Sequence, residues 1–259
     1  MATATTDPGP LLSENDRAGM AALLVDVDSV ELKLTVPEGD QRSTVAALGL
    51  DPLQAEIRQV FFFDTPDLIL NTSGLVVRAR RTQKKGDDSI VKLRPVVPTD
   101  LPKRLRRSRG LGVEVDAMPS GFVCSASLKG APSTDILQGV SGKRPLRKLF
   151  SKEQRALFSE HAPDGIELDG LAVLGPIFVL KLRYTPKGFD RRLVAEMWLY
   201  PDNTRILELS TKCAPSEAWD VAAEARTFLA GKGVDLLGEQ QTKTRTALQF
   251  FSRELGEGA

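Results

Sequence analysis

The sequence predicts an α+β domain that is mainly β. Its strands each have one charged face, and helices flank them. Two observations predict this class. Apolar and polar residues alternate with period two in seven short segments, which is typical of strands whose two faces meet different surroundings. Helical signals separate and follow these segments. The chain has 259 residues, 41% of them hydrophobic, which is enough apolar material for one sizeable core.

The alternating segments span residues 30–36, 75–80, 90–94, 113–116, 179–183, 196–199 and 205–209. In the first of them, valines and leucines share one face while Glu31 and Lys33 share the other. Residues 151–154 have the spacing of a capping box and predict a short helix toward Glu160. An alanine-rich helix is predicted over 217–230 and a last helix from about Thr242 to Arg253. Loops are predicted at 95–102, 130–142 and 163–176.

The chain shows no internal repeat and no second-domain boundary. We therefore expect one domain over residues 21–255, preceded by a flexible tail at 1–20. Lys and Arg number 35 against 34 Asp and Glu, so the chain lacks the strong basic excess of proteins that grip nucleic acid with their whole surface. No apolar stretch reaches the length of a membrane span, and no membrane is expected among the partners.

The cysteine and histidine content narrows the chemistry further. Two cysteines do not make a disulfide framework and fit free thiols in a reducing cytosol, so a cytoplasmic location is expected. A single histidine, His161, leaves no room for histidine-rich metal sites or for Ser-His-Asp triads.

The charged faces of the predicted strands carry pairs of one sign. The positive pairs are Arg78 with Arg80, Lys92 with Arg94 and Lys181 with Arg183, and the negative pair is Glu114 with Asp116. Like charges on one strand face repel each other, so these pairs need opposite charges from other strands or from a ligand. A barrel with these faces inward would collect them. Guanidinium and ammonium groups suit phosphate oxygens and carboxylates suit Mg²⁺ or Mn²⁺, so such a lumen suits a metal–polyphosphate complex.

One segment resembles a known family. Residues 61–67 read FFFDTPD and are followed by Leu70, Gly74 and the basic pair at 78 and 80, an order that is similar to the signature of the CYTH family, the triphosphate tunnel metalloenzymes. Further segments of the family pattern are similar to residues 90–93, 109–116, 181–183, 207–209 and 242–244. The resemblance thus covers roughly residues 25–255.

The resemblance implies an eight-stranded antiparallel closed barrel, a triphosphate tunnel, flanked by helices. It also implies metal-dependent hydrolysis of a triphosphate-containing small molecule with Mg²⁺ or Mn²⁺. The implied phosphate-binding residues are Arg78, Arg80, Lys92, Arg94, Lys181, Arg183 and Lys243. The implied metal ligands are Glu31, Glu114, Asp116, Glu196 and Glu208. Glu31 and Lys33 are the expected catalytic residues, with Lys33 orienting or deprotonating the attacking water because neighbouring cations lower the pKa of a lysine.

The sequence departs from the family pattern at two positions. The family begins with Glu-x-Glu-x-Lys, and here Ser29 replaces the first glutamate; Ile206 stands where the family often has a glutamate before Glu208. Each change removes a possible cation ligand. A non-catalytic protein that binds polyphosphate or nucleotides with a degenerate metal site is therefore an alternative to the hydrolase.

Inorganic triphosphate is the default substrate because it needs no recognition of an organic group. A class IV-like adenylate cyclase and a thiamine triphosphatase are further alternatives, the latter with Trp198 or Trp219 as a stacking surface or, equally, as core residues. The basic run 103–109 is read as a solvated loop or as an RNA-binding segment. Residues 119–176 either cover the tunnel mouth or pack outside it, and both monomer and homodimer stay open.

Overall fold

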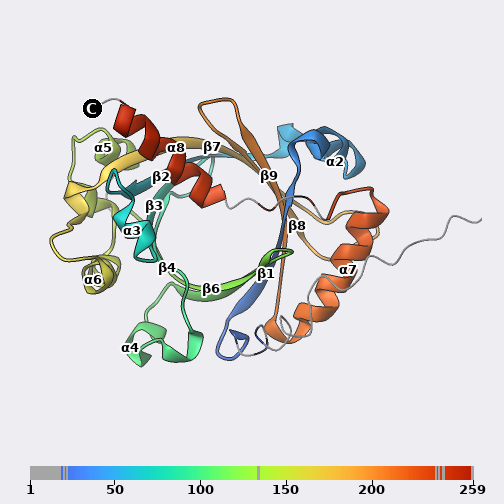
Figure 1. The fold of residues 1–259 in the computed structure, drawn as a ribbon, viewed down its shortest axis with the longest axis horizontal. Coiled ribbons are helices and arrows are strands. Elements are labelled where there is room, and N and C mark those ends of the chain that lie inside the picture. Colours follow the sequence, from blue (N-terminus) through green and yellow to red (C-terminus); the bar gives the residue numbers. More distant parts are fainter. Residues whose placement is uncertain are drawn as a thin grey trace, which may run out of the picture.

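The computed structural model describes residues 19, 21, 23–132, 135–236, 238, 240 and 243–257. Over these residues, nine strands close into a barrel and the helices surround it (Figure 1). The strands are β1 (Ser29–Val36), β2 (Glu56–Asp64), β3 (Leu75–Thr82), β4 (Asp88–Leu93), β5 (Leu111–Met118), β6 (Gly121–Gly130), β7 (Ala172–Tyr184), β8 (Leu193–Leu199) and β9 (Arg205–Cys213). Most of the tail predicted at residues 1–20 lies outside the described residues.

The strand order around the barrel is β1-β5-β6-β4-β3-β2-β7-β8-β9, and β9 pairs with β1 to close it. All neighbours are antiparallel except β1 and β5, which run parallel. The prediction of eight antiparallel strands was therefore wrong in the number of strands and in one pairing. The two errors have one cause, because a closed ring with an odd number of strands cannot alternate in direction throughout.

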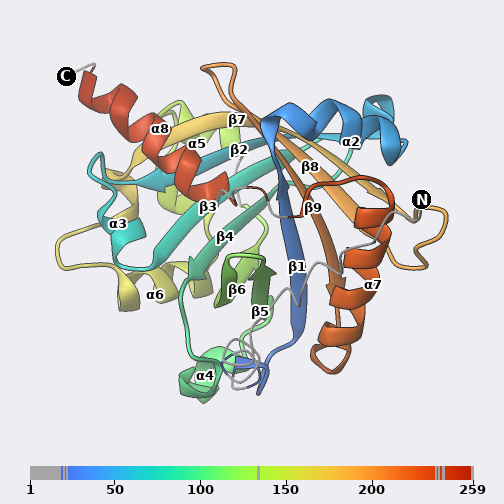
Figure 2. The same cartoon turned by 45° about the vertical axis from the view of Figure 1, so that its right-hand side comes forward.

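The helices and short 3-10 turns connect the strands and cover the barrel. The helices are α2 (Gln41–Ala47), α3 (Ile69–Thr72), α4 (Lys103–Arg106), α5 (Ile136–Val140), α6 (Lys152–His161), α7 (Ala218–Gly231) and α8 (Lys243–Glu257). The 3-10 turns are η1 (Glu38–Asp40), η2 (Pro52–Gln54), η3 (Pro98–Asp100), η4 (Leu146–Leu149), η5 (Leu168–Gly170) and η6 (Pro215–Glu217). Figure 2 shows α7 along the outside of β1 and β9.

The predicted capping box begins α6. The hydroxyl of Ser151 accepts a hydrogen bond from the backbone N–H of Gln154, and the side-chain oxygen of Gln154 accepts one from the backbone N–H of Ser151. The alanine-rich helix is also confirmed, as α7. The last predicted helix is α8, although its expected first residue, Thr242, lies outside the described residues.

Helices α5 and α6 pack on the outer face of the barrel. Phe61 and Phe63 of β2 point outward into an apolar cluster with Leu149 and Phe158. The buried amide of Gln154 donates to the carbonyl oxygens of Ser89 and Leu128 at 2.9 and 3.0 Å, which fixes α6 against β4 and β6. Within residues 119–176, the helices α5 and α6 thus pack outside the barrel, whereas residues 121–130 and 172–176 are part of the barrel strands β6 and β7.

Helix α8 packs on the inward side of the wall. Leu248, Phe250 and Phe251 join a buried cluster with Val60 and Phe62, and these two β2 side chains also line the lumen. The N-terminal end of α8 points toward the centre of the barrel (Figure 1). The fold thus places the first turn of α8 at the lumen. Among the described residues, no helix combines the length and the apolar character needed to cross a membrane.

Candidate active site

The lumen of the barrel forms a cavity of about 1400 Å³. Among the described residues, eleven lysines and arginines and six carboxylates line it, an excess of five cations. Every site residue predicted from the sequence lines this cavity except Arg183. Arg183 is exposed on β7 with its Nη1 atom 3.7 Å from Glu56 Oε2. The charged strand faces that the sequence singled out therefore converge on one enclosed space.

Three carboxylates form the carboxylate cluster: Glu31 on β1, with Glu114 and Asp116 on β5. One oxygen from each lies within 4.8 Å of the others. The parallel pairing of β1 and β5 produces this cluster, because it places Glu31 beside Asp116 and Ser29 beside Glu114. The hydroxyl of Ser29 donates to Glu114 Oε2 at 3.1 Å. The serine in place of the family glutamate thus orients a carboxylate and adds no charge.

Lys33 lies beside the carboxylate cluster on the same face of β1. Its Nζ atom is 3.0 Å from Glu31 Oε2 and 2.7 Å from Asp116 Oδ1. Burial disfavours the charged amine, but the carboxylates of Asp116, Glu31 and Glu208 outweigh it and raise the pKa of Lys33. The expectation that neighbouring cations lower this pKa was wrong, since the nearest groups are anions. The neighbouring carboxylates thus favour the charged form of Lys33.

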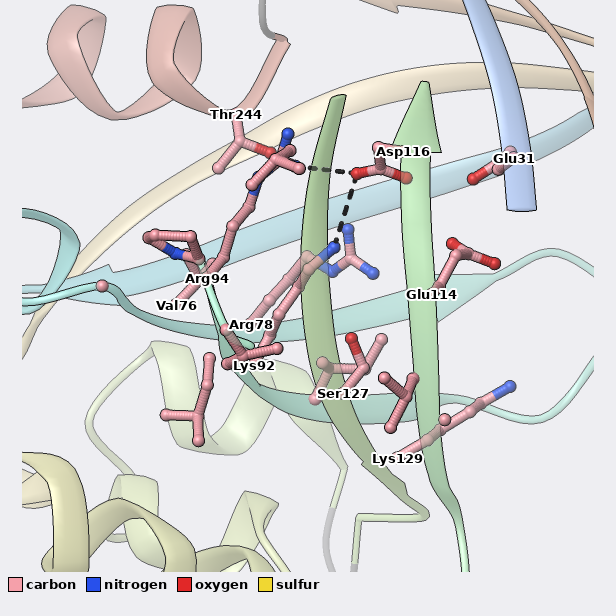
Figure 3. A pocket seen from close by; sticks show the side chains of 18 of the residues that line it. Glu31, Val76, Arg78, Lys92, Arg94, Glu114, Asp116, Ser127, Lys129 and Thr244 are labelled. Carbon is pink, nitrogen blue, oxygen red and sulfur yellow. Dashed lines mark hydrogen bonds and ion pairs between the residues drawn. The ribbon is translucent and has the colours of Figure 1, made fainter. Parts of the chain in front are cut away.

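A basic wall on β3 and β4 faces the carboxylate cluster. Figure 3 shows Arg78, Lys92 and Arg94 extending across the cavity toward it. Arg94 Nη1 is 2.9 Å and Lys92 Nζ 3.9 Å from Asp116 Oδ2. Burial lowers the pKa of Lys92 to about 8; Asp116 opposes this shift, and the charges of Lys33 and Arg94 add to it. The wall therefore holds cations that are short of anionic partners.

Arg78 is the least compensated of these cations. No carboxylate within the described part of the chain forms an ion pair with it, and its buried Nε atom has no hydrogen-bond partner. Burial and the charge of Arg80 lower the pKa of Arg78 to about 10, although Asp88 and Glu196 act in the opposite direction. Arg80 itself is paired with Asp88 at 2.6 Å. Arg78 thus presents an unpaired guanidinium to the lumen.

Glu196 on β8 and Glu208 on β9, the glutamate pair, face each other across the strand pairing. Lys181 Nζ lies 2.5 Å from Glu196 Oε1, and Lys243 of α8 contacts Glu196 and lies 2.7 Å from Glu208 Oε1. Trp198 Nε1 donates to Glu196 Oε2 at 3.3 Å. Burial opposes ionisation of Glu196, but Lys243 and Lys181 hold its pKa well below the usual range.

The sequence did not identify four cations of the lumen, Arg58, Lys129, Lys212 and Arg245. Arg58 Nη1 is 4.0 Å from Glu196 Oε1, and Lys212 pairs with Glu114. Arg58 belongs to β2, whose residues Val60 to Asp64 are all buried, so no alternation marks its inward face. Lys212 continues the parity of Glu208 along β9 and could have been found by extending that pattern.

Asp28, just before β1, does not line the lumen. Its Oδ2 atom accepts a hydrogen bond from the backbone N–H of Val113 at 2.7 Å. The basic run 103–109 also lies outside the cavity lining. Arg104 pairs with Glu160 at 2.6 Å and Arg106 donates to backbone carbonyl oxygens, so these side chains serve the packing of α4.

No family model and no curated protein matches this chain. The solved structures that are similar to it include the following two. A candidate adenylate cyclase from Bacillus halodurans aligns with a TM-score of 0.58 and 12% identity, over 85% of this chain and 97% of that one. The chain has the same barrel fold. A candidate adenylyl cyclase from Hippeastrum, described as having a dominant triphosphatase activity, aligns with a TM-score of 0.53 and 18% identity, over 82% of this chain and 91% of that one.

Proposed function

We propose that this chain binds triphosphate compounds in the barrel lumen together with a divalent cation and hydrolyses their terminal phosphoanhydride bond. The observation that carries the proposal is Arg78, a buried guanidinium without an anionic partner in a cavity whose lining has five more cations than anions. Burying unpaired charge is costly, so such a lumen is stabilised by a polyanion. A triphosphate chain has the required charge density and offers several oxygens to each guanidinium.

The carboxylate cluster fits Mg²⁺ or Mn²⁺. Its three carboxylates offer hard oxygen ligands from two neighbouring strands within 4.8 Å of one another, next to the basic wall. A divalent ion held by Glu31, Glu114 and Asp116 would supply Lewis-acid stabilisation of phosphate oxygens. The roles predicted for the individual ligands stay predictions.

The chain's own residues would position and stabilise the reacting phosphoryl group. Arg78, Arg80 and Lys92 would bind its oxygens and neutralise charge in the transition state, which is the main requirement of phosphoryl transfer. Lys33, held protonated, would orient the attacking water or a phosphoryl oxygen and would not remove a proton. The bond from the terminal phosphorus to the bridging oxygen breaks as the bond to the water oxygen forms, and the proton that the water loses passes to a phosphate oxygen.

Phosphate release from inorganic triphosphate with Mg²⁺ or Mn²⁺ tests the proposal. Arg78→Gln should lower the rate on the order of 10²–10³-fold, as expected for loss of one group that stabilises the transition state. Arg81→Gln is the matched control, because Arg81 lies on the other face of β3 and donates to Gln59 Oε1 at 2.5 Å. Full activity in Arg78→Gln would show that the lumen is not the reaction site. Tight binding without release would favour the non-catalytic alternative.

A second candidate, a nucleoside triphosphate substrate, is favoured by the size and lining of the cavity. A volume of about 1400 Å³ exceeds the needs of an inorganic chain, and Val60, Val76 and Ile90 give part of the lining an apolar character. The names of the two similar structures agree with this candidate. Comparing inorganic triphosphate, thiamine triphosphate and ATP, with detection of cyclic products, distinguishes hydrolysis from cyclisation. Trp198 is buried and stacks on Phe62, which does not favour a thiamine stacking role.

A further inference from the structure

Lys243 reaches the lumen from a helix, whereas the other cations near the glutamate pair come from strands. It contacts Glu196 and Glu208, and its Nζ atom lies 5.2 Å from the ring centroid of Trp198. The hydroxyl of Tyr200 donates to the carbonyl oxygen of Lys243 at 2.9 Å and so anchors the first turn of α8. The ammonium is therefore placed by the packing of a whole helix.

The packing of α8 makes this placement rigid. Ala247 and Leu248 are buried in the cluster that includes Val60 and Phe62, and the hydroxyl of Ser252 donates to the carbonyl oxygen of Pro66 at 2.7 Å. Ile206, on the same face of β9 as Glu208, belongs to the same buried cluster. Where the related family often has a third carboxylate, this chain thus has an apolar contact for α8.

The two carboxylate groups of the lumen differ in what they offer to a divalent ion. The carboxylate cluster has three carboxylates with oxygens within 4.8 Å of one another, and Lys33, Lys92, Arg94 and Lys212 lie beside it. The glutamate pair has two carboxylates, and the ammonium of Lys243 contacts both of them while that of Lys181 contacts Glu196. A cation therefore already bridges the two glutamates, and it would repel a divalent ion at that place.

We propose that Lys243 acts as a tethered cation in the place of a second divalent ion, so that the lumen takes one divalent ion per chain. The inference rests on the proposed function, because the cation would contact the bound triphosphate in the same lumen as the carboxylate cluster. The single ion binds at Glu31, Glu114 and Asp116. The glutamate pair takes none while Lys243 is present.

Counting bound Mn²⁺ by electron paramagnetic resonance, without triphosphate, tests this directly. The wild-type chain should bind one ion, and Lys243→Met should bind a second, because the glutamate pair loses one of its two ammoniums. Lys243→Arg keeps the cation and should bind one ion. Arg245→Met, a change in the same turn of α8 that also lines the cavity, should bind one ion as well. Two ions in the wild type, or one in a folded Lys243→Met chain, would overturn the proposal.

Glu196→Gln gives a second test that does not depend on α8 staying in place. The variant should still bind one Mn²⁺ with wild-type affinity, since the ion does not use the glutamate pair. A fall of tenfold or more in Mn²⁺ affinity would contradict the proposal. These measurements are independent of turnover. A chain that binds one Mn²⁺ without releasing phosphate refutes the proposed function alone, and a chain that turns over with two bound ions refutes only the tethered cation.

Discussion

Glu31 and Asp116 lie opposite each other on the parallel strands β1 and β5 and share the ammonium of Lys33, at 3.0 and 2.7 Å. Parallel register brings these two carboxylates to the same level of the lumen, where they would repel each other without a cation between them. The lysine two residues after Glu31 provides that cation within the same strand. The parallel pairing of β1 with β5 thus both helps to close the barrel and brings the carboxylate cluster together.

Asp116→Asn should destabilise the folded chain by about 3 kcal/mol in the absence of ligands, because removing one partner of a buried ion pair leaves cations uncompensated. Asp116 is almost fully buried and faces Lys33, Lys92 and Arg94. Denaturant unfolding measures the change. Glu160→Gln, which breaks an exposed pair with Arg104, should cost less than about 1 kcal/mol. Equal losses in the two variants would contradict the charge balance described for the lumen.

Arg78→Met should stabilise the ligand-free chain by about 1–2 kcal/mol, because it replaces a buried unpaired cation with an apolar group of similar length. The same variant should lose most of the stabilisation that triphosphate gives to the wild type, since ligand-linked stability follows affinity. Thermal melting with and without triphosphate measures both effects. Arg81→Met, on the outer face of β3, is the control and should keep the ligand-dependent shift.

Triphosphate affinity should fall as pH rises above about 8, because burial lowers the pKa of Lys92 to about 8. A bound anion favours the protonated amine, so the contribution of Lys92 to affinity is fully present below the pKa of the free chain and is lost above it. Titration calorimetry between pH 7 and 9.5 measures the loss. Lys92→Arg stays charged over this range and should show a flatter profile. An unchanged slope in Lys92→Arg would assign the pH dependence to another group.

Glu56 should contribute to stability against acid. Burial would raise its pKa, but hydrogen bonds from Lys85 and Arg58 outweigh this and lower the pKa to about 2 from an ordinary value of 4.5. Since the folded pKa is depressed, the contribution is present above pH 4.5 and disappears as the pH falls toward 2. Glu56→Gln should therefore unfold at neutral pH with a lower free energy and lose less stability than the wild type between pH 4.5 and 2. Denaturant unfolding at several pH values checks both.

The sequence was sufficient to predict the strands whose two faces differ. All seven alternating segments form strands, and their charged faces, Arg183 excepted, line the cavity because the period of two is fixed by the pleat. The strands that were missed lack this contrast. In β2, Val60 to Asp64 are buried on both faces of the strand. In β6, the small residues from Cys124 to Ser127 give the two faces of the strand similar polarity and size.

Contacts between residues that are far apart in the chain could not be predicted from the sequence. The parallel register of β1 with β5 follows from the way nine strands close, and no residue within either strand encodes it locally. The shift in the pKa of Lys33 had the wrong predicted sign for the same reason, because its nearest partner, Asp116, is contributed by a different strand. Residues 172–176 were read as a loop because of Gly175 and Pro176, yet they belong to β7.

The pairing of β1 with β9 has a consequence for how the chain is made. The hydroxyl of Ser210 donates to Glu31 Oε1 at 3.0 Å across a sequence separation of 179 residues. During synthesis, β1 leaves the ribosome long before the strand that completes its hydrogen bonding, and closing so large a loop is entropically costly. We therefore expect the edge of β1 that pairs with β9 to lack its partner until residues 205–213 have been synthesised. Closure of the barrel by the pairing of β1 with β9 should therefore be a late step in folding.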